Sequence, residues 1–346
     1  MSQIVRPTTK PGTAETSFSL LVGTSNPKPV VLACIDRSHH GRRVLAQAGA
    51  LASAMGGELV LMRVLDPHSD SDLPPDPVDW EVRRHEAGSA LARLAERAGV
   101  DARFVLAQGR PADEIRHEAA RLEAEFIVLG RFGEDADDTE RAARVGATAR
   151  AILESAQECV LLVPEGDPVA KGVRRILVPL DGSCWAESAL PTAMRLARAT
   201  GAEILLAQIV TPPEFVCPTP PEPDDIELRA RIMDRNNRVA RQYLERQRNV
   251  LAEQGVLVRT RVITAADARD RLLELLREDA LDLVVLSARG SGFRHLPGRH
   301  FGSVAAHLSL HSATPLLIVR PDTDASQRRG GRHAVAIAPT RAALHA

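Results

Sequence analysis

The stretch VVLACID, residues 30–36, has a counterpart in RILVPLD, residues 175–181, and this repetition decides the fold. Each stretch is a short, mostly apolar run that ends in an aspartate. Runs of this kind are typical of a buried strand in a parallel sheet. We therefore expect two copies of one domain, and 346 residues are enough for two such domains.

The segments that follow these two stretches also come in the same order. Apolar residues at helical spacing predict a helix after each opening strand, and Gly56 and Gly201 stand where C-terminal caps belong. The apolar stripes are Val44, Ala48, Leu51 and Met55 in the first copy and Ala189, Ala193, Leu196 and Ala197 in the second. Second strands are predicted at residues 58–65 and 203–210, and this order predicts right-handed parallel crossovers.

The remainder of each copy follows the same plan. A Pro-rich, acidic excursion without regular structure is expected at residues 66–79 and again at 211–225, each followed by a long helix. Further strands are predicted at residues 102–107, 125–130 and 159–164 and at 256–262, 282–287 and 315–321, with helices at 112–124 and 266–277. The predicted units are a flexible segment 1–28, a first domain 29–165, a second domain 172–321 and a flexible tail 322–346.

Composition narrows the classes of function. A net charge of -1 and only 3% aromatic residues argue against nucleic acid as a partner. Runs of apolar residues are too short for a membrane span or a signal peptide, so we expect a cytoplasmic protein without a membrane partner. The cysteines Cys34, Cys159, Cys184 and Cys217 form no C-x-x-C pair, which argues against a zinc or redox site.

The loop after the fourth strand of the second copy, residues 287–303, carries the features of a phosphate site. Gly290 and Gly292 let the backbone approach a ligand, and Gly302 with Ser303 opens a helix with free amide groups. Basic residues lie in the same loop, at Arg289, Arg294, His295, Arg299 and His300. The alternative interpretation is an ordinary helix N-cap beside a solvated charged loop.

The first copy serves as an internal comparison. Its loop, residues 130–148, keeps Gly130, Gly133 and Gly146, but Ala147 replaces the hydroxyl residue. It also inserts Glu134, Asp135, Asp137, Asp138 and Glu140. Two like charges 4 Å apart repel by about 4 kcal/mol at an effective dielectric constant near 20, so these carboxylates predict a degenerate phosphate site. A solvated insertion or a metal-binding acidic loop are the other interpretations.

On these residues the chain resembles the universal stress protein family in its tandem form. The resemblance rests on VPLDGS at residues 178–183, on the loop 287–303 and on TPLLIV at residues 314–319. Members that bind nucleotides have Gly-x-x-Gly, nine residues, then Gly-Ser or Gly-Thr. Here Ser287 stands at the first glycine, and eleven residues separate Gly290 from Gly302.

The resemblance implies an α/β fold with two open, parallel five-stranded sheets in the order 3-2-1-4-5, helices on both faces and association of the two fifth strands. It implies ATP or ADP, with Mg²⁺ as an accompanying ion, in the second domain. Asp36 and Asp181 end the first strands, where a carboxylate could bind a nucleoside or cap the next helix. Together with the charge pattern, the implied site is Pro179, Asp181, Ile209, Ser287, Arg289, Gly290, Gly302, Ser303 and Val304. The corresponding residues of the first copy are Asp36, Val64, Gly130 and Gly133, with Cys34 in place of Pro179.

The expected function is that of a nucleotide-responsive stress-response protein that forms a homo-oligomer. The alternative is an interaction or scaffold protein on the same fold that binds no nucleotide. The chain has no G-x-x-x-x-G-K-[ST] or G-x-S-x-G motif, and Leu308 stands between His307 and His311 where a zinc peptidase needs Glu. We therefore expect no catalytic residue, and at most slow ATP hydrolysis or phosphoryl transfer to Ser303.

Overall fold

The computed structural model describes residues 28–37, 39–67, 76–97, 102–133, 144–166, 172–213, 223–291 and 302–320. Several expectations fall outside this described part: the flexible ends, the acidic residues 134–140, Gly292 and the basic residues 294–300. Among the described helices, none is long and apolar enough to cross a membrane.

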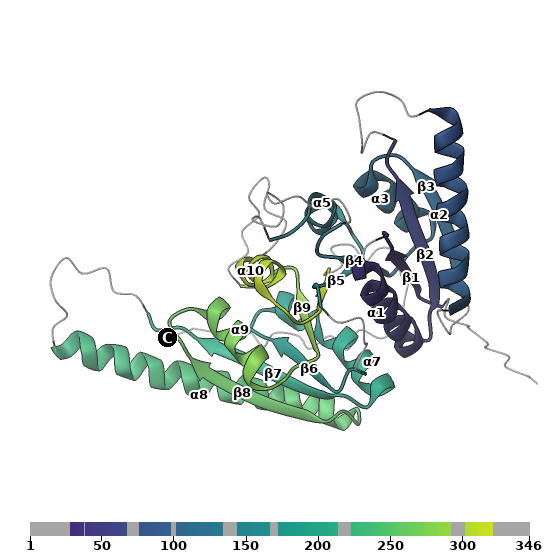
Figure 1. Cartoon of the computed structure of the whole chain (residues 1–346). Helices are drawn as coiled ribbons and strands as arrows, with labels where there is room; N and C mark the ends of the chain where they lie inside the picture. Colours follow the sequence, from purple (N-terminus) through teal and green to yellow (C-terminus); the bar gives the residue numbers. More distant parts are fainter. Residues whose placement is uncertain are drawn as a thin grey trace, which may run out of the picture.

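The strands form one continuous ten-stranded mixed sheet (Figure 1). The first domain contributes β1 (Val30–Cys34), β2 (Glu58–Leu65), β3 (Ala102–Gln108), β4 (Phe126–Gly130) and β5 (Cys159–Val163). The second contributes β6 (Arg175–Pro179), β7 (Glu203–Val210), β8 (Val258–Thr264), β9 (Leu283–Ser287) and β10 (Leu316–Val319). The order β3-β2-β1-β4-β5-β10-β9-β6-β7-β8 confirms a parallel 3-2-1-4-5 arrangement in each half. The two expected sheets are halves of one sheet.

The joint between the halves is an antiparallel pairing of β5 with β10. Leu161 lies opposite Leu317, and each is the third residue of its segment, CVLLV or PLLIV. The domains are therefore related by a local two-fold axis near this pair. This pairing confirms the expected association of the fifth strands. It also explains why both strands are apolar throughout, because a central strand is covered on both faces.

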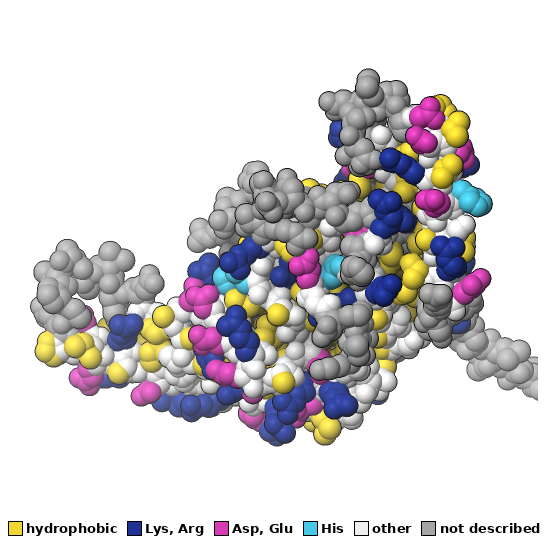
Figure 2. Space-filling view, viewed as in Figure 1, with side chains coloured by type: hydrophobic (Ala, Val, Ile, Leu, Met, Phe, Trp, Pro, Cys, Tyr) yellow, Lys and Arg dark blue, Asp and Glu magenta, His cyan; other side chains and the backbone are white. Residues whose placement is uncertain are grey.

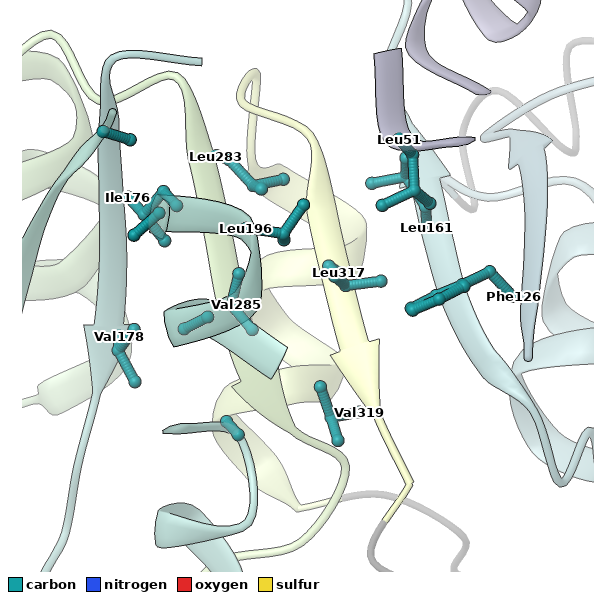
Figure 3. Close-up of a cluster of buried hydrophobic side chains, with 14 of the residues drawn as sticks. Leu51, Phe126, Leu161, Ile176, Val178, Leu196, Leu283, Val285, Leu317 and Val319 are labelled. Carbon is teal, nitrogen blue, oxygen red and sulfur yellow. The ribbon is translucent and has the colours of Figure 1, made fainter. Parts of the chain in front are cut away.

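Helices cover both faces of the sheet. One face carries α1 (His39–Met55), α2 (Pro77–Arg97), α6 (Cys184–Glu187), α7 (Leu190–Thr200) and α8 (Pro223–Glu253). The other carries α3 (Pro111–Arg121), α5 (Ala147–Ser155), α9 (Ala268–Glu278) and α10 (Ser303–His311). The core is divided by face rather than by domain, since each of two buried clusters contains side chains of both halves. Figure 3 shows one cluster at the joint, where Leu161 and Phe126 of the first domain face Leu317 of the second.

The helix ends agree with the sequence in part. Gly56 and Gly201 have φ angles of 62° and 72°, the left-handed conformation expected of C-terminal caps. The long helices begin earlier than predicted, because Pro77 and Pro223, assigned to irregular excursions, stand at the first helical position. Proline is favoured there because its missing N–H has no helical acceptor to lose.

The helix predicted after the sixth strand is interrupted. It consists of α6 and α7, and Pro191 lies in the first turn of α7. Proline cannot donate to the preceding turn, so a continuous helix across this point would lose a hydrogen bond. The predicted stripe is nevertheless confirmed, with Ala189, Ala193 and Leu196 all buried.

Polar contacts also hold the joint. The Arg195 guanidinium pairs with the Glu125 carboxylate at 2.6 Å, from Nη1 to Oε1. Arg131 donates to the carbonyl oxygen of Ser312 at the C-terminal end of α10, and Arg320 donates to the carbonyl oxygen of Leu153 in α5. Burial lowers the pKa of Arg131 and lowers that of Arg320 to about 10. The last helix of each domain is thus held at its C-terminal end by an arginine of the other domain.

Candidate functional site

The second-domain candidate site lies at the carboxyl ends of β6 and β9, which are neighbours in the sheet. β7 lies on one side of β6 and β9 lies on the other, so the strand order reverses between β6 and β9. Open α/β sheets bind their ligands at such a point. Asp181 follows β6, Gly290 follows β9, and Gly302 precedes α10.

The Asp181 carboxylate joins the two loops. Its Oδ1 accepts hydrogen bonds from the Ser183 amide at 3.0 Å and the Ser183 hydroxyl at 2.6 Å, and its Oδ2 accepts from the Ser291 amide at 2.6 Å. Burial alone would raise the pKa of Asp181, but these donors outweigh it and lower the pKa. Ser183 is the N-cap of α6, so Asp181 supports the start of that helix through Ser183.

Glycines allow the loops to approach one another closely. A Cβ atom on Gly290 would stand 2.6 Å from Asp181 Oδ2, and one on Gly302 would stand 3.6 Å from the Gly290 amide nitrogen. Gly302 is the N-cap of α10, as expected, but its own N–H donates to the Ala288 carbonyl at 2.7 Å. The expectation of a free amide at Gly302 is therefore wrong. The N–H groups without an acceptor inside the helix are those of the first turn, beginning at Ser303.

Ser287 and Arg289 contact α6 and the segment after it. Ser287 is buried, and its hydroxyl oxygen accepts from the Ser188 hydroxyl at 3.3 Å and from the Arg289 amide at 3.2 Å. The Arg289 guanidinium lies 5.4 Å from the ring centre of Trp185, a cation–π geometry. Sequence reasoning missed Trp185, although it is one of only two tryptophans in the chain.

The other predicted residues border this region. Pro179 is the last residue of β6 and pairs with Ala207, while Ile209 lies near the end of β7. Ile209 and Val304 are partly buried against the cluster under α9 and α10. The structure thus brings Asp181, Gly290 and Gly302 together and places the rest around them.

Tyr243 of α8 is a second residue that sequence reasoning missed. Its hydroxyl donates to Glu187 Oε1 at 2.9 Å, and the Gln247 side chain donates to the same oxygen at 3.0 Å. Burial and the Glu187 carboxylate raise the pKa of Tyr243, which therefore stays protonated. Tyr243 thereby links α8 to α6 through the Glu187 carboxylate.

The first domain has a cavity of about 870 Å³ at the corresponding end of its half-sheet. It is lined by the first-copy residues that correspond to the predicted second-domain site: Cys34, Asp36, Val64, Gly130 and Gly133. The start of α5 also repeats the geometry of α10, because the Gly146 amide donates to the Arg131 carbonyl at 2.9 Å. Burial raises the pKa of Cys34 to about 12, so a neutral thiol faces the cavity.

His40 of α1 packs against Gly130, one of the residues that line the cavity. Its Nε2 lies 3.0 Å from the Val163 carbonyl oxygen, so this nitrogen carries the proton. A Cβ atom on Gly130 would stand 2.5 Å from the His40 ring. Burial lowers the pKa of His40, so the ring is neutral at neutral pH.

Together, these features define a tandem α/β protein of the doubly wound class, with one strand-end site region in each half. The model of the universal stress protein family matches residues 29–164 and 172–320. The chain belongs to the universal stress protein family and contains two of its domains in tandem.

Solved structures that match most of the chain share this fold. A universal stress protein from Archaeoglobus fulgidus DSM 4304 is 19% identical with a TM-score of 0.62, and the match covers 86% of this chain and 98% of that one. A functionally unknown protein from Pseudomonas aeruginosa PAO1 is 15% identical with a TM-score of 0.59, covering 85% and 93%. A universal stress protein solved in complex with cAMP is 21% identical with a TM-score of 0.30, covering 40% and 98%. No curated protein matches the chain.

Proposed function

We propose that the chain is a nucleotide-responsive stress-response protein whose second domain binds ATP or ADP. One observation carries this proposal: the N-terminus of α10 lies beside Gly290, and Gly290 lies against the Asp181 carboxylate. Helix N–H groups, a glycine that lets the loop backbone approach closely and a hydrogen-bond acceptor are thereby gathered in one small region. Each matches a different part of a nucleotide.

In this proposal the first-turn amides at Ser303 and Val304 bind phosphate oxygens, with the helix dipole favouring negative charge. Asp181 accepts a hydrogen bond from a ribose hydroxyl or the adenine amino group, since each carboxylate oxygen has more than one acceptor position. Pro179 and Ile209 border the nucleoside. Arg289 adds positive charge, and Mg²⁺ would arrive bound to the phosphates.

Isothermal titration with ATP and ADP tests this proposal directly. Gly302→Val should abolish binding, because the valine side chain would stand at the start of α10, where the phosphates are proposed to bind. The backbone conformation of Gly302 is one that valine can adopt, so the chain should still fold. Ser303→Ala should weaken binding by removing the hydroxyl group. Gly146→Val, the same change at the start of α5, is the matched control and should leave this binding intact. The proposal fails if neither nucleotide binds, or if Gly302→Val and Ser303→Ala bind like the parent.

The alternative function is a scaffold that needs no nucleotide. The shared cores and the continuous sheet favour it, because they make a large rigid platform without any ligand. Mass spectrometry of small molecules released from the freshly purified chain separates the two functions. A nucleotide at about one per chain supports the first, while its absence, with a protein partner retained with or without added ATP, supports the scaffold.

A further inference from the structure

The described sheet ends in β3 on one side and in β8 on the other. The two fifth strands are paired with each other at the joint, so they are not open to a second chain. An edge strand presents a row of unpaired backbone N–H and C=O groups, and proteins usually protect such a row with charged side chains or a cover. The two edge strands of this sheet differ in that protection.

β8 is protected by its side chains. The Thr260 hydroxyl donates to Glu245 Oε1 of α8 at 2.9 Å, which ties the helix to the edge strand. Arg261 follows and pairs with Asp279 at 2.5 Å, from Nη1 to Oδ2. Two copies of β8 paired about Arg261 would bring two arginines face to face, and like charges directly opposite each other destabilise a sheet. The β8 edge therefore disfavours its own copy.

β3 has apolar residues at the corresponding positions. In the register of the sheet, Phe104 takes the place of Thr260. On the helix, Ala92 takes the place of Glu245, since each directly follows a motif Ala-x-x-x-Leu whose alanine and leucine are buried. A phenylalanine and an alanine cannot form the hydrogen bond that ties α8 to β8.

A groove of about 540 Å³ lies between α2 and β3, and we call it the edge groove. Gly88 and Ala92 line it from the helix, and Phe104 and Leu106 line it from the strand. A Cβ atom on Gly88 would meet no described atom within 4 Å, so the groove is open at this point. Phe104 is 45% exposed. Figure 2 shows apolar side chains at the molecular surface around α2, between charged ones.

Charged side chains beside the edge groove are paired within the chain. Arg84 contacts Glu81 at 2.9 Å, and Arg103 pairs with Glu58. These described ion pairs leave little charge to attract an acidic or basic peptide. An apolar surface that is complementary to itself suits a second copy of the same chain.

Backbone geometry determines how two copies of β3 can pair. The Gly109 amide donates to the Leu65 carbonyl of β2, and backbone groups of alternate residues point to opposite sides of a strand. The even-numbered residues of β3 therefore direct their N–H and C=O groups away from β2. An antiparallel pair centred on Val105, the middle residue of β3, allows all of these groups to bond and gives the longest overlap.

In this register the side chains are compatible across the two-fold axis. Phe104 of one copy lies opposite Leu106 of the other, an aromatic–aliphatic pair beside the edge groove. Arg103 lies opposite Ala107, so the two arginines do not face each other. Val105 lies opposite its own copy, where the corresponding residue of β8 is an arginine.

We propose that two copies of the chain associate through β3 and the edge groove, as a closed two-fold dimer. Such an interface uses the same surface on both chains, so it ends at two copies and leaves β8 at each outer edge. It assigns a surface to the homo-oligomer expected from the sequence. It does not depend on nucleotide binding in the second domain.

Sedimentation velocity of the full chain tests the proposal between about 1 and 100 µM, the range in which a small interface associates. The parent should change from monomer to dimer with concentration and form no larger species. Ala92→Glu combined with Phe104→Thr installs the pair that ties α8 to β8, so this variant should stay monomeric at every concentration. Leu257→Thr is the matched control, because it changes a side chain that is 70% exposed next to β8 and should leave the dimer intact.

Disulfide trapping tests the register. Residues that face each other at a non-hydrogen-bonded position of an antiparallel pair have Cα atoms about 4.5 Å apart, which a disulfide can span. Val105→Cys should therefore link two chains when diamide is added as the oxidant. Arg261→Cys, the corresponding change in β8, should not link them, and the parent shows the background from its own four cysteines.

Four results would overturn the proposal. They are a parent that stays monomeric at every concentration, a dimer that survives the double variant in a folded chain, linking through Arg261→Cys in place of Val105→Cys, and assemblies larger than a dimer. The last would indicate head-to-tail pairing of β3 with β8, which does not close. The trapping experiment does not use the double variant, so it decides the matter even if that variant does not fold.

Discussion

Asp181 shows how one residue can serve both the fold and a ligand site. Of the two alternatives that the sequence left open, helix capping is carried out by Ser183, and Asp181 accepts from the amides of Ser183 and Ser291, while its position beside Gly290 leaves the ligand role as a prediction. The sequence could identify Asp181 because an aspartate after an apolar strand has few other uses. It could not identify Trp185 or Tyr243, because their roles depend on which distant loops they meet.

Asp181→Asn should lower the free energy of unfolding by about 1 kcal/mol at neutral pH, because the amide nitrogen of Asn cannot accept from the Ser291 amide. The folded-state pKa of Asp181 is lowered, so its contribution is fully present above the pKa of the unfolded chain, near 3.9. It is lost as the pH falls from there through the folded-state pKa. Urea unfolding from pH 7 to pH 3 should show this loss in the parent but less of it in the variant. Identical pH profiles would contradict this assignment.

Gly130→Ala should destabilise the chain by roughly 1–3 kcal/mol, because the added methyl group would stand 2.5 Å from the His40 ring. Gly133→Ala is the matched control, since nothing lies within 4 Å of its added Cβ atom. Urea unfolding of the two variants measures the difference. Equal stabilities would show that His40 does not pack against Gly130 as described.

Among the elements, the strands were the most predictable. Apolar runs such as residues 30–34 and 283–287 are buried on both faces, so hydrophobicity alone determines them. The starts of α2 and α8 were less predictable, because Pro77 and Pro223 are compatible with either a loop or the first turn of a helix. The cavity was not predicted, because its volume depends on how α2 packs over the ends of the strands.

The β5–β10 pairing gives a prediction for the joint. Leu317→Ala should cost roughly 2–5 kcal/mol of unfolding free energy, because Leu317 is fully buried between the two halves. Leu257→Ala removes the same atoms from a side chain that is 70% exposed and should change stability by less than about 0.5 kcal/mol. Denaturant titration of both variants tests this contrast, and a small effect at Leu317 would argue against a continuous sheet.

For the whole molecule, the described core extends across both domains, so the two domains should unfold together. Trp80 lies in the first domain and Trp185 in the second, and each can be isolated by changing the other to Phe. The two single-tryptophan variants should give the same urea midpoint. Midpoints that differ beyond the effect of the substitutions themselves would indicate independent domains and would contradict the shared cores.

The tandem arrangement was predicted because the repeat is visible in the residues of both copies. The sequence also favoured the second domain as the ligand site, because its loop combines glycines with basic residues. The structure adds that the first domain, judged degenerate from its acidic insertion, contains a cavity of about 870 Å³. Loop charge is readable from sequence, whereas free volume depends on how a distant helix packs.

The central claim, a nucleotide site at the start of α10, is tested most directly by titrating ATP into the Trp80→Phe variant and following Trp185 emission. Arg289 lies over Trp185, so bound phosphates should change that emission in a saturable way, with one nucleotide per chain and no response in the Trp80→Phe, Gly302→Val double variant. Trp185 emission that does not change with ATP, together with Trp80 emission that does change in the Trp185→Phe variant, would contradict the claim.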